Sequence, residues 1–513
     1  MQNNPNTTLV TAIAPLATAT HGGRAKCLQR LARLDLPVPT TVALSFAADI
    51  TAIIEQFPKE ALLCVRPSSE DPDWGGPSAI LNIGMNDTRY EMLCATLGTD
   101  AASALFARFV QSYAIHVDRL DPDMFDDVAG EGPGQLADVL SAYEAETEIP
   151  FPATRAEQLE GVLKSMSRAW DVTSARLLRQ AKGAPLDAGL GLVIQQMAFG
   201  VGQGECGSGV LQLVSSKTGM PQIKGRYLRQ SQGRDALRAD ADSLYITRDP
   251  RGPSLEEAVP EAFSQLVDHA RLMRTRLREE MQVEFTIENG ALRILDGVRV
   301  ARSSRAAVRI AVQLARDGII AKEEALMRIE PNTLNELLHR QIDRHAKRDL
   351  LGTGIAASPG AATGRLVFSA NEAQASAARE EDCILVRRET SPEDIRGMHA
   401  ARAIITERGG ITSHAAVIGR GIGLPCVVGV GDMRFQTRKG QLVTSDGRVI
   451  LAGEVVTVDG TNGTILLGAP EMLEAALDDA FQDLMDWADA VRDIDIRANA
   501  DTPADAQTAH NFR

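Results

Sequence analysis

The chain has 513 residues, enough for about three domains, and its 44% hydrophobic and 24% charged content is typical of folded globular proteins rather than disordered ones. Its net charge of −14 argues against a nucleic-acid partner, because binding a duplex needs a basic surface. Six scattered cysteines without a Cys-x-x-Cys pair argue against a disulfide framework, and the lack of a basic leader or a long apolar run predicts a cytoplasmic protein.

The first predicted element is a helix within 22–40, where Leu28, Leu31 and Leu34 recur at helical spacing before two prolines end the pattern. Residues 61–69 then form an apolar run that predicts a strand. This strand leads into a polar, Gly-rich loop.

The middle of the chain mixes long helices with strands. Segments 89–145 and 154–182 have helical patterns, whereas 190–202 reads as a buried strand followed by a Gly-rich turn. A further strand is expected over 210–216, and the amphipathic period returns over 256–280. This mixture of long helices and short strands predicts α+β architecture.

Residues 283–297 predict a β-hairpin, because two alternating runs flank Asn289 and Gly290. An Asn-Gly pair favours the type I′ turn, in which both central residues take positive φ. Residues 302–350 that follow are mostly charged and are expected to be helical.

A domain boundary is predicted near 340–352, where a charged segment changes to a Gly- and Ala-rich one. Short apolar strands then alternate with Gly turns and one clear helix at 414–420, as in a compact α/β domain of about 120 residues. A final acidic helix is expected at 470–492. The predicted division of the chain is 1–340, 341–470 and 471–513.

The strongest chemical signal lies in 404–429, where a short strand ends in Gly409 and Gly410. Two glycines allow a tight turn and a close approach of the backbone to a bound group. Thr412 and Ser413 are natural N-cap residues for the helix that begins at His414. A helix N-terminus binds anions such as phosphate, so a histidine there is suited to accept a phosphoryl group as the neutral imidazole. The alternative is a structural or merely exposed histidine.

This segment closely resembles the phosphohistidine loop of the phosphoenolpyruvate (PEP)-utilising enzymes, which include pyruvate, phosphate dikinase, PEP synthase and enzyme I of the sugar phosphotransferase system. The matching positions are Gly409, Gly410, Thr412, Ser413, His414, Ala415, Ala416, Arg420, Gly423, Pro425 and Cys426. Segments 351–368 and 387–406 resemble the dikinase in particular, and shorter matches extend to the N-terminal region. The resemblance implies an ATP-grasp nucleotide-binding region followed by a swivelling phosphohistidine domain.

The resemblance also implies a nucleotide site with changed residues. Arg24 stands where the family has lysine, whereas Arg66 and Gln195 match a phosphate-binding arginine and a glutamine near the nucleotide. Of the family's two metal-hairpin carboxylates only Glu284 is kept, and Asp296 replaces a glutamine and offers a second Mg²⁺ ligand. We therefore expect weak Mg·ATP binding.

Ordinary structural roles stay open for these residues. Arg66 could pair with Glu70 or Asp71, Glu284 could face solvent, and Asp296 could be a solvated loop residue.

The family's PEP- and pyruvate-binding barrel corresponds to sequence beyond residue 513, since 497–503 resembles its first strand. One hypothesis is therefore a dikinase-type enzyme that phosphorylates His414 from ATP and needs a barrel in trans to reach pyruvate or PEP. A second is a catalytically impaired paralogue acting as a regulatory phosphocarrier, and a third is a truncated gene product. A homodimer is also open, and no membrane partner is expected.

Overall fold

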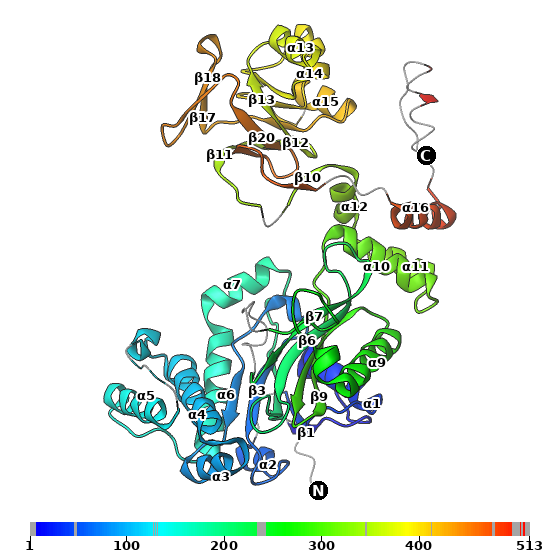
Figure 1. Ribbon diagram of the computed structural model, residues 1–513. Helices are drawn as coiled ribbons and strands as arrows, with labels where there is room; N and C mark the ends of the chain where they lie inside the picture. The colour runs from blue at the N-terminus through cyan, green and yellow to red at the C-terminus, as the bar shows by residue number, and fades with distance from the viewer. Residues whose placement is uncertain are drawn as a thin grey trace. The chain divides into compact units, whose positions relative to one another are not determined.

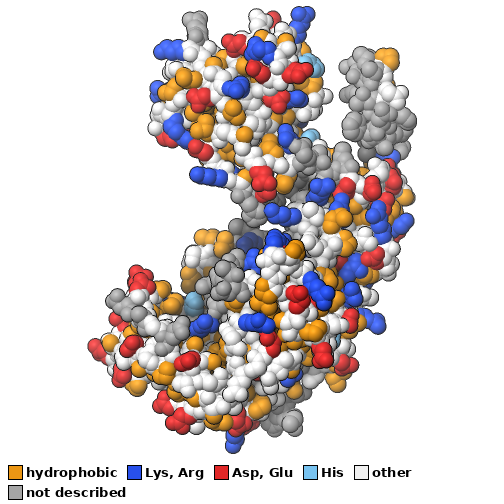
Figure 2. Space-filling model, viewed as in Figure 1, with side chains coloured by type: hydrophobic (Ala, Val, Ile, Leu, Met, Phe, Trp, Pro, Cys, Tyr) orange, Lys and Arg blue, Asp and Glu red, His pale blue; other side chains and the backbone are white. Residues whose placement is uncertain are grey.

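The computed structural model describes residues 7–45, 49–126, 128, 130, 132–232, 243–343, 346–411, 413–473, 478–494, 503, 506 and 507. The chain divides into two compact units, each with its own cores. Unit 1 contains residues 1–216 and 220–301, and unit 2 contains residues 217–219 and 302–513. Figure 1 shows both units, and Figure 2 shows acidic and basic side chains interspersed on the visible face.

Unit 1 is built on two antiparallel sheets. The five-stranded sheet has the order β1 (Thr7–Leu9), β2 (Thr41–Leu44), β5 (Gly191–Gln196), β3 (Leu63–Ser68), β4 (Ile80–Ile83). The four-stranded sheet has the order β7 (Pro221–Arg229), β6 (Gly207–Val214), β8 (Met281–Glu288), β9 (Ala291–Arg299). The predicted hairpin is confirmed as β8–β9, with φ of 48° at Asn289 and 80° at Gly290, as a type I′ turn requires.

Helices bury the apolar faces of these sheets. One core joins the five-stranded sheet to α3 (Asp87–Leu97), α4 (Thr99–Tyr113), α5 (Gly132–Thr147) and α6 (Arg155–Asp171). A second core joins the four-stranded sheet to α1 (Thr18–Arg33) and α9 (Pro260–Leu277), through Leu28 and Leu31 on α1 and Leu266 and Met273 on α9. The remaining short helices of the unit are α2 (Ile50–Ile54), α7 (Thr173–Ala181) and α8 (Leu255–Ala258).

Predicted helix 89–145 is not continuous. Gly98, at φ 93°, separates α3 from α4, and α4 runs into a π-helical turn at Ala114–Asp118. Strand β7 was not predicted, and its alternately exposed residues explain why no apolar run marks it. Within the described residues, no helix is long and apolar enough to cross a bilayer.

In unit 2, helices α10 (Ser304–Arg316), α11 (Lys322–Met327) and α12 (Pro331–Leu338) share a core with α16 (Asp479–Val491). Val308 and Val312 of α10 meet Phe481 and Leu484 of α16 there. The final helix begins at Asp479 and not near residue 470 as predicted. A short strand, β22 (Met472–Leu473), comes before it. The segment 497–503 that resembles a barrel strand lies almost wholly outside the described residues.

The largest element of the remainder of unit 2 is a mixed sheet of eight strands. Its order is β11 (Leu350–Thr353), β21 (Thr464–Leu467), β20 (Val455–Asp459), β13 (Ala361–Val367), β14 (Cys383–Arg387), β15 (Ala403–Thr406), β16 (Cys426–Val428), β12 (Ile355–Ser358), with β13 to β16 parallel. Both faces are covered, since Ile384 and Leu385 of β14 enter different cores. The predicted strands of this region are thus confirmed. The predicted boundary at 340–352 falls inside unit 2, between its helical part and this sheet, and the functional division of the chain stays a prediction.

Helices α13 (Ala370–Ala378), α14 (Ile395–Ala400) and α15 (His414–Gly421) belong to the same part of the chain as the mixed sheet. Ala415 and Ala416 of α15 pack with Leu385 and Ile404 in one core. A three-stranded sheet of β17 (Met433–Gln436), β18 (Gln441–Thr444) and β19 (Val449–Leu451) contributes to the other core, and β10 (Gln341–Ile342) pairs with β22. Helix α15, at the predicted position, thereby has a rigid support.

The opening loop of unit 1 depends on Gly22, whose φ of 81° interrupts α1. A Cβ at this position would lie 1.6 Å from the carbonyl oxygen of Ser68. The Ser68 hydroxyl in turn donates to the His21 carbonyl at 2.7 Å and accepts from the Ala25 amide at 3.1 Å. This close approach fixes the start of α1 against the end of β3.

We expect Gly22→Ala to lower the free energy of unfolding of unit 1 by about 3 kcal/mol, because it combines positive-φ strain with overpacking. Gly183→Ala is the matched control, since Gly183 has φ 85° but nothing within 4 Å of its added Cβ, and it should cost only about 1 kcal/mol. Urea unfolding followed by circular dichroism measures both. Equal losses in the two variants would contradict the close-approach argument.

Candidate functional site

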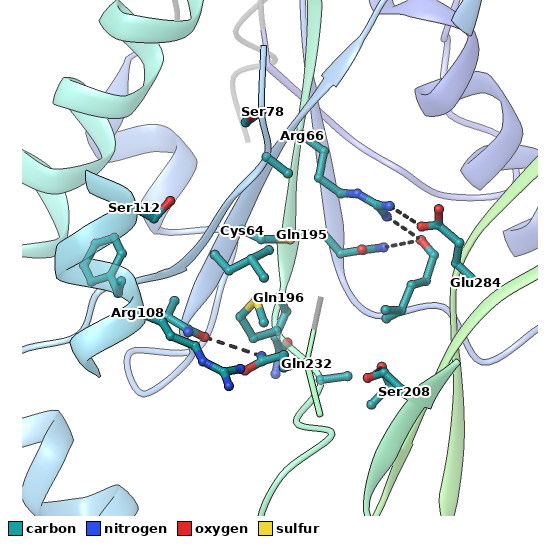
Figure 3. A pocket seen from close by; sticks show the side chains of 18 of the residues that line it. Cys64, Arg66, Ser78, Arg108, Ser112, Gln195, Gln196, Ser208, Gln232 and Glu284 are labelled. Carbon is teal, nitrogen blue, oxygen red and sulfur yellow. Dashed lines mark hydrogen bonds and ion pairs between the residues drawn. The ribbon is translucent and has the colours of Figure 1, made fainter. Parts of the chain in front are cut away.

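Four of the predicted nucleotide residues line one cleft of unit 1, between the two sheets. Arg24 comes from α1, Arg66 from β3, Gln195 from β5 and Glu284 from β8, and the cavity has a volume of about 620 Å³. Figure 3 shows Arg66, Gln195 and Glu284 converging on one end of it. Residues more than 200 positions apart in sequence, such as Arg66 and Glu284, are thus brought together across the two sheets by packing.

Arg66 is held by two partners at this end. Its Nη2 donates to Glu284 Oε2, and its Nη1 donates to the Leu295 carbonyl at 3.2 Å. Burial alone would lower the pKa of Arg66, but the Glu284 and Asp296 carboxylates outweigh that effect and hold the pKa above its usual range. The guanidinium therefore stays charged, and its pairing with Glu284 replaces both alternatives left open by the sequence for these two residues.

A β-bulge in the hairpin decides where Asp296 lies. From the turn outward the register is regular as far as Phe285 opposite Ile294, but then Glu284 pairs with Asp296, so Leu295 is the extra residue. In an unbroken register Asp296 would oppose Val283 and point to the other face of the sheet. The bulge thus places the carboxylates of Glu284 and Asp296 side by side and frees the Leu295 carbonyl for Arg66.

Asp296 is buried, with a relative exposure of 1%, so the alternative of a solvated loop residue is wrong. Its Oδ2 accepts from Arg24 Nε at 2.6 Å and lies 3.7 Å from Arg66 Nη2. Burial first, and then the Asp296 carboxylate, raise the pKa of the nearby Cys27 thiol to about 12. The four charged side chains therefore form two close ion pairs, Arg24–Asp296 and Arg66–Glu284, and a longer third contact between Arg66 and Asp296.

Gln195 is buried beside these pairs. Its Nε2 donates to the Thr41 hydroxyl at 3.1 Å and approaches the Leu295 carbonyl at 3.5 Å. The side chain thereby connects β2 and β5 of one sheet to the bulge in the other.

The fit of a divalent cation depends on which carboxylates face the cleft. Glu284 lines it, whereas Asp296 does not, and the described residues contain no group of three or more His, Cys, Asp or Glu side chains placed to hold a metal. Mg²⁺ commonly uses one or two carboxylates together with substrate phosphates. Glu284 therefore suits a cation that arrives with a nucleotide, and the proposed ligand role of Asp296 has no support in the geometry.

The opposite wall of the cleft contains polar residues that the sequence analysis missed. Arg108, Ser112 and His116 follow one another at four-residue intervals along α4 and the π-helical turn, and all three line the cavity. A row of polar residues at every fourth position of a largely apolar helix was the available signal. These residues extend the polar lining of the cleft beyond the end where Arg66 and Glu284 lie.

The predicted histidine loop lies in unit 2, between β15 and α15. Gly409 has φ 124°, and a Cβ added to it would lie 3.0 Å from the Cβ and Oγ of Ser413. Ser413 occupies the N-cap position but makes no capping hydrogen bond, and its buried Oγ has no partner among the described residues. Thr412 lies outside the described residues. Of the two predicted capping residues, Ser413 thus occupies the N-cap position of α15, but its hydroxyl does not accept the predicted hydrogen bond from the helix backbone.

His414 is the first residue of α15 and is half-buried. Its Nδ1 lies 3.2 Å from the hydroxyl of buried Thr390, which follows β14 in the chain. This contact leaves Nε2 as the nitrogen for chemistry. Thr390 was not singled out from the sequence, since a threonine 24 positions away carries no local signal.

Arg420, near the end of α15, secures the loop. Its Nη2 donates to the Ile411 carbonyl and its Nη1 to the Ala357 carbonyl of β12, each at 2.7 Å. The side chain therefore ties the histidine loop to the edge strand of the sheet. A planar guanidinium with donors on two edges suits this role better than a lysine would.

Comparisons with known proteins agree with these observations. Residues 379–463 match the family described as PEP-utilising enzyme, mobile domain. The pyruvate, phosphate dikinase of Rhizobium meliloti is 38% identical over 479 residues, 88% of this chain and 53% of that protein. That of Clostridium symbiosum is 35% identical over 469 residues, 87% of this chain and 53% of that protein. The chloroplastic one of Flaveria pringlei is 34% identical over 484 residues, 90% of this chain and 50% of that protein.

Among solved structures, the solution structure of Enzyme I (nEIt) is 19% identical and covers 37% of this chain and 61% of that one. Its TM-score of 0.14 is too low to support an argument about the fold. The chain spans about half the length of the curated relatives it matches. Over that half, the chain is similar to pyruvate, phosphate dikinases, and its residues 379–463 match the mobile domain of the PEP-utilising enzymes.

Proposed function

We propose that this chain is a phosphotransferase in which His414 accepts a phosphoryl group from ATP bound in the cleft and carries it toward pyruvate or PEP, with a barrel domain acting in trans. In this proposal unit 1 is the ATP-grasp region, and the mixed sheet of unit 2 is the swivelling phosphohistidine domain. The observation that supports it most is His414 at the N-terminus of α15 with its Nδ1 on Thr390. The name that the relatives share agrees with it.

The chemistry follows from the histidine loop. The Nε2 lone pair of a neutral imidazole attacks the β-phosphorus of ATP, an N–P bond forms, and the P–O bond to AMP breaks with its electron pair staying on AMP. Inorganic phosphate then takes the terminal phosphoryl group as pyrophosphate, which leaves one phosphoryl group on His414. Thr390 on Nδ1 holds the ring in one orientation as Nε2 becomes bonded. The unpaired N–H groups at the start of α15 and the positive end of its dipole stabilise the phosphoryl oxygens.

The cleft supplies the nucleotide side of the proposal. Arg24 and Arg66 offer charge for the phosphates, and the cavity of about 620 Å³ lies within the usual range for small-molecule sites. A Mg²⁺ ion that arrives with ATP would be held by Glu284 and would neutralise phosphate charge. The weak Mg·ATP binding expected from the sequence stays a prediction.

The alternative function is a regulatory phosphocarrier with an impaired nucleotide site. It is favoured by the pairing of both cleft arginines with carboxylates, since a phosphate must compete with Glu284 and Asp296 for them. The two functions differ in the donor that phosphorylates His414.

We expect ATP labelled in its phosphates to give an acid-labile, base-stable label on the protein, and His414→Ala to abolish it. His399→Ala is the matched control, because His399 is an exposed histidine of the same unit. Phosphoprotein assay after acid and base treatment measures the label. A label that survives His414→Ala would show that another residue is the acceptor.

We expect Thr390→Val to slow labelling of His414 roughly fivefold, because a lost hydrogen bond to the ring is worth about 1 kcal/mol. Thr390→Ser, which keeps the hydroxyl, should restore the rate. Thr363→Val is the control, since it also removes a threonine hydroxyl bond, to Thr457 at 2.7 Å, in the same sheet. Labelling of Thr390→Val at the wild-type rate, or equal slowing in the control, would contradict the positioning role.

We expect a separately expressed dikinase barrel, mixed with this chain, to transfer label from PEP to His414 in the absence of ATP. In the same mixture ATP, phosphate and pyruvate should give PEP, AMP and pyrophosphate only with His414 present. Labelling from PEP without PEP synthesis from ATP would favour the phosphocarrier. No labelling from either side would reject the phosphotransferase proposal.

A further inference from the structure

Arg24, Arg66, Glu284 and Asp296 lie at one end of the cleft. They differ in how far each side chain is exposed to it. Relative exposures of the side chains are 24% for Arg24, 14% for Arg66 and 21% for Glu284, but only 2% for Asp296. Arg24, Arg66 and Glu284 line the cavity, whereas Asp296 lies behind Arg24. A bound ligand would therefore touch both arginines and Glu284 before it could touch Asp296.

Both oxygens of the Asp296 carboxylate already have protein partners. Oδ2 accepts from Arg24 Nε at 2.6 Å, and Oδ1 accepts from the Gly297 amide at 2.8 Å. Removing a carboxylate from a buried ion pair leaves an uncompensated charge, which is strongly unfavourable. Recruiting Asp296 to a cation would incur this loss, whereas recruiting Glu284, which is more exposed, would cost less.

Arg24 is fixed along two edges of its guanidinium. Its Nε donates to the Asp296 carboxylate, and its Nη1 donates to the Pro67 carbonyl at the end of β3. The Nη2 nitrogen has no hydrogen-bond partner among the described residues, and Arg24 lines the cleft. A planar guanidinium anchored on two sides presents its third nitrogen in a defined direction.

We propose that Asp296 is a positioning residue for Arg24 and not a ligand of the metal ion. The buried carboxylate orients the guanidinium so that Nη2 can donate to a phosphate oxygen of the nucleotide, and Glu284 is the carboxylate that responds to a divalent cation. The inference rests on the proposed use of the cleft for ATP. In it the Asp296 carboxylate serves as the counter-ion of Arg24.

The test measures the affinity of the full chain for ATP by calorimetry, at several Mg²⁺ concentrations and in EDTA. Asp296→Asn keeps an Oδ1 acceptor for the Gly297 amide but removes the negative charge that faces Arg24. We expect it to weaken ATP binding about tenfold, and to leave the Mg²⁺ concentration that gives half of the metal effect within about twofold of wild type. Glu284→Gln should instead remove the response to Mg²⁺.

A double-mutant cycle separates positioning from direct binding. Arg24→Gln should weaken ATP binding, and adding Asp296→Asn to it should change the affinity much less than Asp296→Asn does alone, because Asp296 acts mainly through Arg24 and only secondarily on Arg66 at 3.7 Å. Asp249→Asn is the matched control, since Asp249 is paired with Arg251 in unit 1 and does not line the cleft, and it should leave ATP affinity unchanged. Circular dichroism establishes that each variant is folded.

Several outcomes would overturn the inference. They are an Asp296→Asn variant that loses its Mg²⁺ response, one that binds ATP as well as or better than wild type, and additive losses in the double variant. Wild-type protein that binds no ATP at millimolar concentration would overturn it as well. The labelling of His414 from PEP through a barrel in trans does not use the cleft, so it decides separately whether the proposed phosphotransfer stands.

Discussion

The architecture of the cleft in unit 1 depends on a cluster of partly buried ion pairs that links α1 and β3 to the β8–β9 hairpin. Arg24 and Arg66 come from α1 and β3, and their carboxylate partners Asp296 and Glu284 come from the β8–β9 hairpin. Breaking one member of such a pair leaves an uncompensated buried charge. The pairs therefore fix the position of the cleft walls and place both arginines on the cleft lining, with their charges balanced by the two carboxylates.

The pairing depends on one extra residue. Without the bulge at Leu295, the alternation of the strand would turn Asp296 away from Glu284 and would return the Leu295 carbonyl to the ladder. With it, this carbonyl accepts from Arg66 and lies near Gln195. A local irregularity of the hairpin thus sets the positions of most polar groups at one end of the cleft.

The histidine site in unit 2 is built by different means. His414 is oriented mostly by backbone and hydroxyl groups. These are the backbone at the start of α15, the loop made possible by Gly409, and the Thr390 hydroxyl, which lies 3.2 Å from the His414 Nδ1. Arg420 acts on the backbone, through two carbonyls, instead of on a ligand. Small residues on one side of α15 let the helix pack closely on the sheet, so the position of His414 is fixed by the core beneath it.

Much of this could be predicted from the sequence, because local rules decide it. The Asn289-Gly290 turn, the helix that begins at His414 and the short strands after residue 352 follow from turn chemistry and apolar runs of neighbouring residues. The motif around His414 pointed to the family that the comparisons support. The register of β8 on β9, the partner of His414 and the choice of Glu284 rather than Asp296 to line the cleft were decided only by tertiary structure, because each depends on residues brought together from distant positions by packing and by a bulge that no local pattern marks.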